Sequence, residues 1–210
     1  METLVRVDTA EQVDEVLETV AWHGHGVELD MTGLDEQEYR AVADAAEASA
    51  AGVRSLHFGR TGSVSLQEWE LFRGQLNQVV ERADRFGCSV VSVAPPQAEI
   101  DESHTVSDLQ QFMEEADRYA GDSDMEICFL LDGFMHDPEM MNTAFDRLQE
   151  PSLGVMVDLA LLVDGMDPLP ILEKIDVQVR KLRLPVPVTE VGEHLGDVSG
   201  DVMVVADPPG

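Results

Sequence analysis

The chain has 210 residues, and 42 acidic against 13 basic residues give it a formal net charge of −29 at pH 7. Its length suits one domain with a substantial core, and a hydrophobic content of 44% argues against a disordered chain. No basic patch for nucleic acid, no apolar run of membrane-spanning length and no signal peptide is present in the sequence. We therefore expect one cytoplasmic domain over residues 1–210, without nucleic-acid or membrane partners and with its oligomeric state left open.

The acidic residues are scattered over every predicted helix instead of forming a tail. This distribution favours a solvated surface adapted to a high-salt cytoplasm over an acidic partner-binding face, because a partner-binding face gathers its charge. Cys128 falls in a predicted strand and Cys88 at the start of another, just before Ser89, so we expect two buried thiols and no disulfide.

Short apolar, β-branched runs recur along the chain and predict eight strands. These are Leu4–Val7, Gly26–Leu29, Val53–Phe58, Ser89–Ala94, Glu126–Leu131, Gly154–Val157, Val179–Leu184 and Val202–Ala206. Amphipathic stretches between them predict helices over Thr9–Ala21, Asp35–Ala50, Ser65–Phe86, Thr105–Tyr119 and Pro138–Leu148. Ser65 and Glu68 form a capping-box signature, and Gly87 follows the same helix as a stop signal.

Regular strand–helix alternation predicts parallel strands with helices packed outside. Eight strands favour a closed (β/α)8 TIM barrel, and 210 residues require a compact one with short loops. The segment after Leu184, PVPVTEVGEHLGDVSG, leaves little room for a seventh helix, which we expect to be short or missing. An open doubly wound sheet is the alternative, but no glycine-rich phosphate loop follows the first strand.

Polar residues stand at the carboxyl ends of the predicted strands, which meet at one mouth in a parallel barrel. They include Glu28, Asp30, His57, Asp132, Asp158, Arg183 and Asp207. Carboxylates and imidazole together suit Mg²⁺, Mn²⁺ or Zn²⁺, which would predict a metal site at the mouth. The simpler interpretation is that acids end strands because strand ends meet water.

Three segments resemble the xylose isomerase-like superfamily of TIM barrels, which includes sugar-phosphate isomerases, epimerases and endonuclease IV-like enzymes. They are GHGVELD (Gly24–Asp30), VRSLHFG (Val53–Gly59) and LNQVVERADRFGCSVVSVAPP (Leu76–Pro96). The resemblance extends over most of the chain from about Gly26. It implies that Glu28 and His57 line a substrate site.

The same resemblance implies a metal site that has lost ligands. Asp158 matches the aspartate that ends the family's sixth strand, and Asp132 and Asp207 stand where glutamates end the fifth and eighth strands. Leu161 and Arg183 replace the two histidines of the family's set. The permanent positive charge of Arg183 would either take over the role of the ion or bind a phosphate or carboxylate of a ligand.

Two hypotheses follow. In the first, the chain is a barrel that kept a pocket for a small polyhydroxylated or phosphorylated ligand without a cofactor, with Arg183, His136 and His194 as ligand-binding residues. In the second, it is an isomerase or epimerase in which His57, Glu28 and Asp132 act as acids and bases. Mn²⁺, Mg²⁺ or Zn²⁺ would then be held by Asp132, Asp158 and Asp207.

Overall fold

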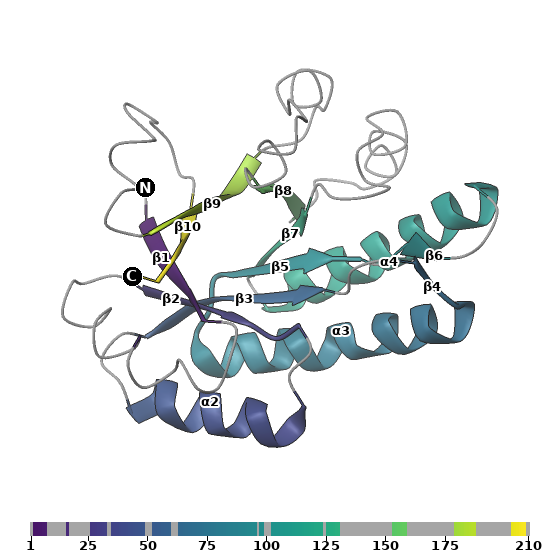
Figure 1. Cartoon of the computed structure of the whole chain (residues 1–210). Coiled ribbons are helices and arrows are strands. Elements are labelled where there is room, and N and C mark those ends of the chain that lie inside the picture. The colour runs from purple at the N-terminus through teal and green to yellow at the C-terminus, as the bar shows by residue number, and fades with distance from the viewer. Residues whose placement is uncertain are drawn as a thin grey trace.

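The computed structural model describes residues 2–7, 16, 26–32, 35–48, 52–59, 63–95, 97–98, 102–123, 125–130, 153–158, 179–187 and 203–208. Within these residues, parallel strands close into a barrel in the order β1-β10-β9-β8-β7-β5-β3-β2 (Figure 1). The barrel strands are β1 (Glu2–Val7), β2 (Gly26–Asp30), β3 (Val53–Gly59), β5 (Val90–Ala94), β7 (Glu126–Leu130), β8 (Leu153–Asp158), β9 (Val179–Pro187) and β10 (Met203–Asp207). The (β/α)8 prediction is confirmed, and the open sheet is excluded.

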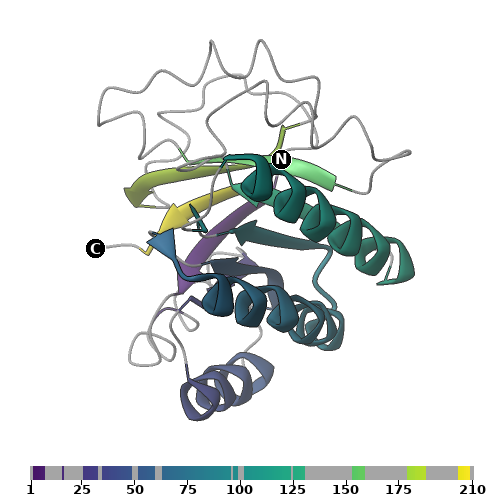
Figure 2. The same ribbon diagram turned by 90° about the vertical axis from the view of Figure 1, so that its right-hand side faces the viewer.

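Three helices are described in full, and they lie outside the barrel (Figure 2). They are α2 (Glu36–Ala48), α3 (Leu66–Phe86) and α4 (Glu102–Ser123). Two short parallel strands, β4 (Ser63–Val64) and β6 (Gln97–Ala98), pair with each other beyond the ends of β3 and β5. Within the described residues, no helix is long and apolar enough to cross a membrane.

The boundaries of α3 follow from its local sequence. The Ser65 hydroxyl accepts a hydrogen bond from the Glu68 backbone, and the Glu68 carboxylate accepts one from the Ser65 backbone, which completes the predicted capping box. Gly87 ends the helix in the left-handed conformation, with φ of 69°, which glycine adopts without a steric cost.

The outward faces of β3, β5 and β7 pack under α3 and α4 around a cluster of aromatic rings. Phe58 and Phe72 stack with ring centroids 4.5 Å apart, and Trp69, Phe112 and Phe129 continue the cluster at centroid distances of 5.7–6.0 Å. Burial of these large rings between helix and strand is a major source of stability in the layer outside the barrel.

Side chains alternate between this outer layer and the barrel interior. The interior towards the amino ends of the strands is apolar and is filled by Leu4, Val90, Cys128, Met156, Met203 and Val205. Cys88 and Cys128 are both buried and unpaired, as expected, and burial raises the pKa of the Cys88 thiol to about 12. The interior turns polar towards the carboxyl ends.

All eight predicted strands are present, with boundaries that differ by no more than a few residues. The largest differences are at β9, which continues to Pro187, and at α4, which begins at Glu102 and ends at Ser123. Of the helix predicted over residues 9–21, Val16 is described, and it is helical and buried. The helix predicted over residues 138–148 and the seventh crossover lie outside the described residues.

Candidate functional site

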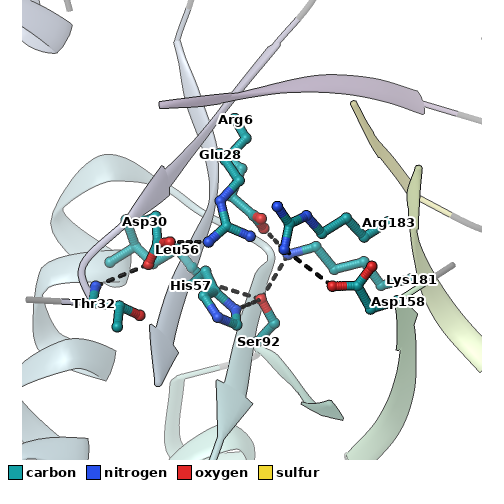
Figure 3. A network of polar contacts seen from close by, with 10 residues as sticks. All are labelled: Arg6, Glu28, Asp30, Thr32, Leu56, His57, Ser92, Asp158, Lys181 and Arg183. Atoms are coloured by element: carbon teal, nitrogen blue, oxygen red, sulfur yellow. Dashed lines mark hydrogen bonds and ion pairs between the residues drawn. The ribbon is translucent and has the colours of Figure 1, made fainter. Parts of the chain in front are cut away.

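Four fully buried polar side chains form a layer across the barrel interior, which we call the polar layer. Glu28, Ser55, Ser92 and Lys181 belong to it, and they come from β2, β3, β5 and β9. Lys181 Nζ donates to Oε2 of Glu28, to Oγ of Ser55 at 2.7 Å and to Oγ of Ser92 at 2.8 Å (Figure 3). Ser55 Oγ in turn donates to Glu28 Oε2 at 3.0 Å. Side chains far apart in the sequence thus form one hydrogen-bonded unit.

The charge state of Lys181 reflects two opposing effects. Burial, reinforced by the positive charge of Arg6, lowers the pKa of Lys181 well below its usual value, whereas a carboxylate in direct contact favours the charged form. The three acceptors around Nζ match the three N–H bonds of an ammonium group, and a neutral amine has two. We therefore treat Lys181 and Glu28 as a buried pair that shares one proton.

His57 lies next to the polar layer, towards the mouth. Its Nδ1 is 3.0 Å from Ser92 Oγ, and the residue is 5% exposed. Burial lowers the pKa of His57 to about 4, while Asp30 opposes this shift, so the imidazole is neutral at pH 7. A methyl group at Gly59 would lie 2.8 Å from Cβ of Ala94 and 3.3 Å from Nε2 of His57, so the absence of a side chain there makes room for the ring.

Two ion pairs flank His57. Arg6 on β1 pairs with Asp30 on β2, and the Asp30 carboxylate also accepts a hydrogen bond from the Thr32 backbone at 2.8 Å. On the other side, Arg183 Nη1 on β9 donates to Oδ2 of Asp158 on β8 at 3.0 Å. Figure 3 shows both guanidinium groups turned towards the region that holds His57 and the polar layer.

Each of the three buried carboxylates at this end of the barrel has its own cation. Glu28 pairs with Lys181, Asp30 with Arg6 and Asp158 with Arg183. Within the described residues three positive and three negative side chains therefore balance around a neutral imidazole. Among the side chains of these three pairs, Nε of Arg6, Nε of Arg183 and Oε1 of Glu28 are buried without a described partner.

The structure brings five of the polar residues predicted at the mouth together: Glu28, Asp30, His57, Asp158 and Arg183. Asp207 ends β10, where the pairing with β9 shifts register, and within the described residues no ion pair joins it to the other five. Asp132, His136 and His194 lie outside the described residues, so their roles stay predictions.

Sequence reasoning missed Lys181, Ser55, Ser92 and Arg6. A signal was present for Lys181, because side chains two residues apart in a strand point to the same face. An inward Arg183 therefore requires an inward Lys181. Ser55 carried the same signal, because it lies two residues before the predicted His57 in β3, whereas no predicted site residue lies at that spacing from Ser92.

The described residues do not fit a divalent metal ion. No group of three or more His, Cys, Asp or Glu side chains suited to a metal occurs among them. Of the three predicted ligands, Asp158 and Asp207 are described, and the carboxylate of Asp158 forms an ion pair with Arg183. A metal ion at this carboxylate would be repelled by the permanent positive charge of Arg183, so these residues do not support chemistry at a bound metal ion.

No protein-family model matches the sequence, and no curated protein is detectably similar to it. Solved structures do match. The TTHB071 protein from Thermus thermophilus, soaked with ZnCl2, has 17% identity and a TM-score of 0.70, covering 97% of this chain and 91% of its own. D-psicose 3-epimerase with D-tagatose from Clostridium cellulolyticum H10 has 12% identity and a TM-score of 0.67, covering 100% and 85%.

A third match is a xylose isomerase-like TIM barrel protein from Mycobacterium smegmatis in complex with magnesium, with 12% identity and a TM-score of 0.63 over 94% of this chain and 80% of its own. This chain shares the TIM barrel fold of these structures. At such identities the likeness establishes the fold and leaves the chemistry to the residues at the mouth. The matching structures include one protein soaked with ZnCl2 and one in complex with magnesium.

Proposed function

We propose that this chain is a barrel of the sugar isomerase/epimerase type that binds a small polyhydroxylated ligand, free or phosphorylated, at its mouth without a divalent metal ion. The observation that carries the proposal is the hydrogen bond of 3.0 Å from Arg183 Nη1 to Asp158 Oδ2. Arg183 thereby places a fixed positive charge on the carboxylate that the family resemblance assigns to the metal.

The balance of charges at the mouth supports a ligand rich in hydroxyl groups. A hydroxyl both donates and accepts, so it can bond to a guanidinium and to a carboxylate without leaving either charge unpaired. Arg183 is more exposed than Arg6, with 27% against 13% of the side chain accessible. We therefore assign Arg183 the first contact with a ligand, including a phosphate if one is present.

The residues of the polar layer have a supporting role in this proposal. Glu28 is fully buried and bonded to Lys181 and Ser55, so we place it beneath the ligand as part of the floor of the site. His57 is the titratable side chain between this floor and the two flanking ion pairs. It is therefore the described uncharged side chain best placed to touch a ligand oxygen after the first contact with Arg183.

The alternative is a divalent-metal-dependent isomerase or epimerase with an altered ligand set. The zinc-soaked and magnesium-bound neighbours favour it. It would require Arg183 to leave Asp158 and the ion to take ligands outside the described residues, such as Asp132.

Metal analysis and ligand titration separate the two functions. We expect protein purified without chelator to contain substoichiometric Mn, Mg and Zn, and D-tagatose, D-fructose or D-fructose 6-phosphate to bind in calorimetry in the presence of EDTA. Arg183→Met should weaken that binding by roughly tenfold to a hundredfold, because a charged hydrogen bond contributes about 1.5–3 kcal/mol.

Arg180→Met is the matched control, since Arg180 is on the same strand and pairs with Glu126 at the opposite end of the barrel. It should bind the same sugar as the wild type does. A stoichiometric, tightly held ion in the wild type would favour the alternative function. Failure of all three sugars to bind would contradict the proposed ligand class.

A further inference from the structure

Ser92 is the link between the polar layer and His57. Its Oγ lies 2.8 Å from Lys181 Nζ, 3.0 Å from His57 Nδ1 and 3.4 Å from the backbone oxygen of Leu56. A serine hydroxyl has one hydrogen to donate. The acceptor to which Ser92 donates this hydrogen determines which ring nitrogen of His57 carries a hydrogen.

Lys181 determines what Ser92 must accept. Lys181 Nζ donates an N–H bond to Ser92 whether the proton shared with Glu28 resides on the amine or on the carboxyl group, because two N–H bonds remain for the serines in either case. A hydrogen bond in the opposite direction would need a neutral amine with a free lone pair, so Glu28 would be either ionised or protonated with its hydrogen pointing away from Nζ. An ionised Glu28 would be fully buried without a counter-charge, and a hydrogen pointing away would give up the hydrogen bond from the carboxyl group to Nζ, so both states are unfavourable.

Because Lys181 donates to Ser92, the Ser92 hydroxyl can donate its own hydrogen to one of two acceptors. Nδ1 of His57 at 3.0 Å is within normal hydrogen-bond distance, and the Leu56 oxygen at 3.4 Å is beyond the usual range. A cationic donor on its oxygen also polarises the Ser92 hydroxyl and makes it a better donor. Ser92 therefore donates to Nδ1, and Nδ1 is the ring nitrogen without a hydrogen.

We propose that Lys181, acting through Ser92, holds His57 as the neutral tautomer with its hydrogen on Nε2, so that His57 meets a ligand as a hydrogen-bond donor and not as a base. Lys181 is then a positioning residue. It sets the chemistry of His57 from the far side of Ser92 without touching the ligand.

The surroundings of His57 support a neutral ring. The charged groups that act on it are Arg6, Asp30, Asp158 and Arg183, two of each sign from four different strands. The two carboxylates raise the pKa of His57 and the two guanidinium groups lower it, and burial is the largest influence. A neutral imidazole with a bare Nδ1 matches a serine donor, whereas an imidazolium would point a second N–H at a hydroxyl that already accepts from Lys181.

The chemical use of this donor rests on the proposed function. A neutral Nε2–H pointing to a carbonyl or hydroxyl oxygen of a polyhydroxylated ligand stabilises developing negative charge there without transferring a proton at the start. An Nε2 without a hydrogen would instead accept hydrogen bonds from the hydroxyl groups of a ligand. The tautomer therefore favours ligands that present an acceptor oxygen, such as the carbonyl group of an open-chain sugar.

The tautomer can be measured directly by two-bond ¹H–¹⁵N correlation spectra of the imidazoles at pH 7, with His57 assigned by its loss in His57→Gln. We expect the wild type to show a protonated Nε2 and an unprotonated Nδ1. Lys181→Met alone leaves the Glu28 carboxylate buried without a cation and is expected to fold poorly, so the informative variant is Lys181→Met with Glu28→Gln. In it the population with the hydrogen on Nδ1 should rise several-fold, because Ser92 becomes free to accept from His57.

The matched control is Arg180→Met with Glu126→Gln, which removes the 3.1 Å ion pair between Arg180, on the same strand as Lys181, and Glu126 on β7. It should leave the His57 spectrum unchanged. A hydrogen on Nδ1 in the wild type would overturn the proposal, and so would an unchanged tautomer ratio in a folded Lys181→Met/Glu28→Gln protein. Neither result bears on metal content or sugar binding, so the tautomer and the proposed function can fail separately.

Discussion

A histidine that is kept neutral inside a protein makes stability depend on pH. His57 is 5% exposed, and burial lowers its pKa from 6.5 to about 4. In the unfolded chain the imidazole takes up a proton below pH 6.5, whereas in the folded chain it does so only near pH 4. The stabilising contribution is thus complete above pH 6.5 and is lost as the pH falls through this window.

We predict that the free energy of unfolding decreases between pH 6.5 and pH 4 by on the order of 3 kcal/mol more in the wild type than in His57→Gln. Urea unfolding at a series of pH values, at constant high salt, measures the difference between the two proteins. Titration of carboxylates is common to both and cancels in the comparison. Parallel pH profiles for the two proteins would show that His57 is not buried as a neutral ring.

At the residue level the sequence predicted Glu28, Asp30, His57, Asp158 and Arg183 at the mouth, and the structure brings these side chains together, with Glu28 deeper in the interior. It did not reveal how they are connected, because the partners of each side chain depend on the stagger between strands. Lys181 illustrates the difference. Its inward orientation follows from its two-residue spacing from Arg183, but its contacts with Glu28 and Ser92 depend on closure of the barrel.

Among the elements, α3 offers the clearest test of a local signal. Ser65→Ala removes the hydroxyl that accepts from the Glu68 backbone and should lower the free energy of unfolding by about 1 kcal/mol. Gln67→Ala is the matched control, since Gln67 is exposed in the same turn and should be nearly neutral. Chemical unfolding of both variants at high salt gives the comparison. Equal stabilities for the two would contradict the capping role of Ser65.

Local patterns predicted the strands and helix caps well because both depend mainly on residues that are close together in the sequence. All eight strands were found from β-branched runs, and both ends of α3 from Ser65 and Gly87. The start of α4 was placed three residues late. The sequence Glu102–His104 contains no helix breaker, and an acidic residue in the first turn suits the helix dipole, so the helix extends to Glu102.

At the scale of the whole molecule the net charge of −29 dominates. Mutual repulsion of carboxylates destabilises a compact chain at low ionic strength and is screened within a few ångströms at molar salt. We predict that the free energy of unfolding falls steadily as KCl is lowered from molar to millimolar concentration at constant pH. A dilution series followed by circular dichroism measures it, with sucrose in place of KCl as the control for non-ionic effects. A flat profile would contradict the high-salt interpretation.

Closure of the barrel was predictable from the number of strands and the length of the chain, since eight parallel strands with short crossovers suit a barrel. The composition of the barrel interior was harder to predict from the sequence. The polar layer places a charged pair inside the barrel, between the apolar part of the interior and the mouth. Burial of a charged pair is costly in isolation, so sequence patterns alone favour assigning such residues to the surface.

The short ladder between β4 and β6 has a mechanical consequence for the mouth. It joins the segment that follows β3 to the segment that follows β5, and these two strands carry His57 and Ser92. Neither segment can swing outward alone without breaking the ladder. Any widening of the entrance on this side must displace both together, which leaves the spacing between imidazole and hydroxyl intact while the opening changes size.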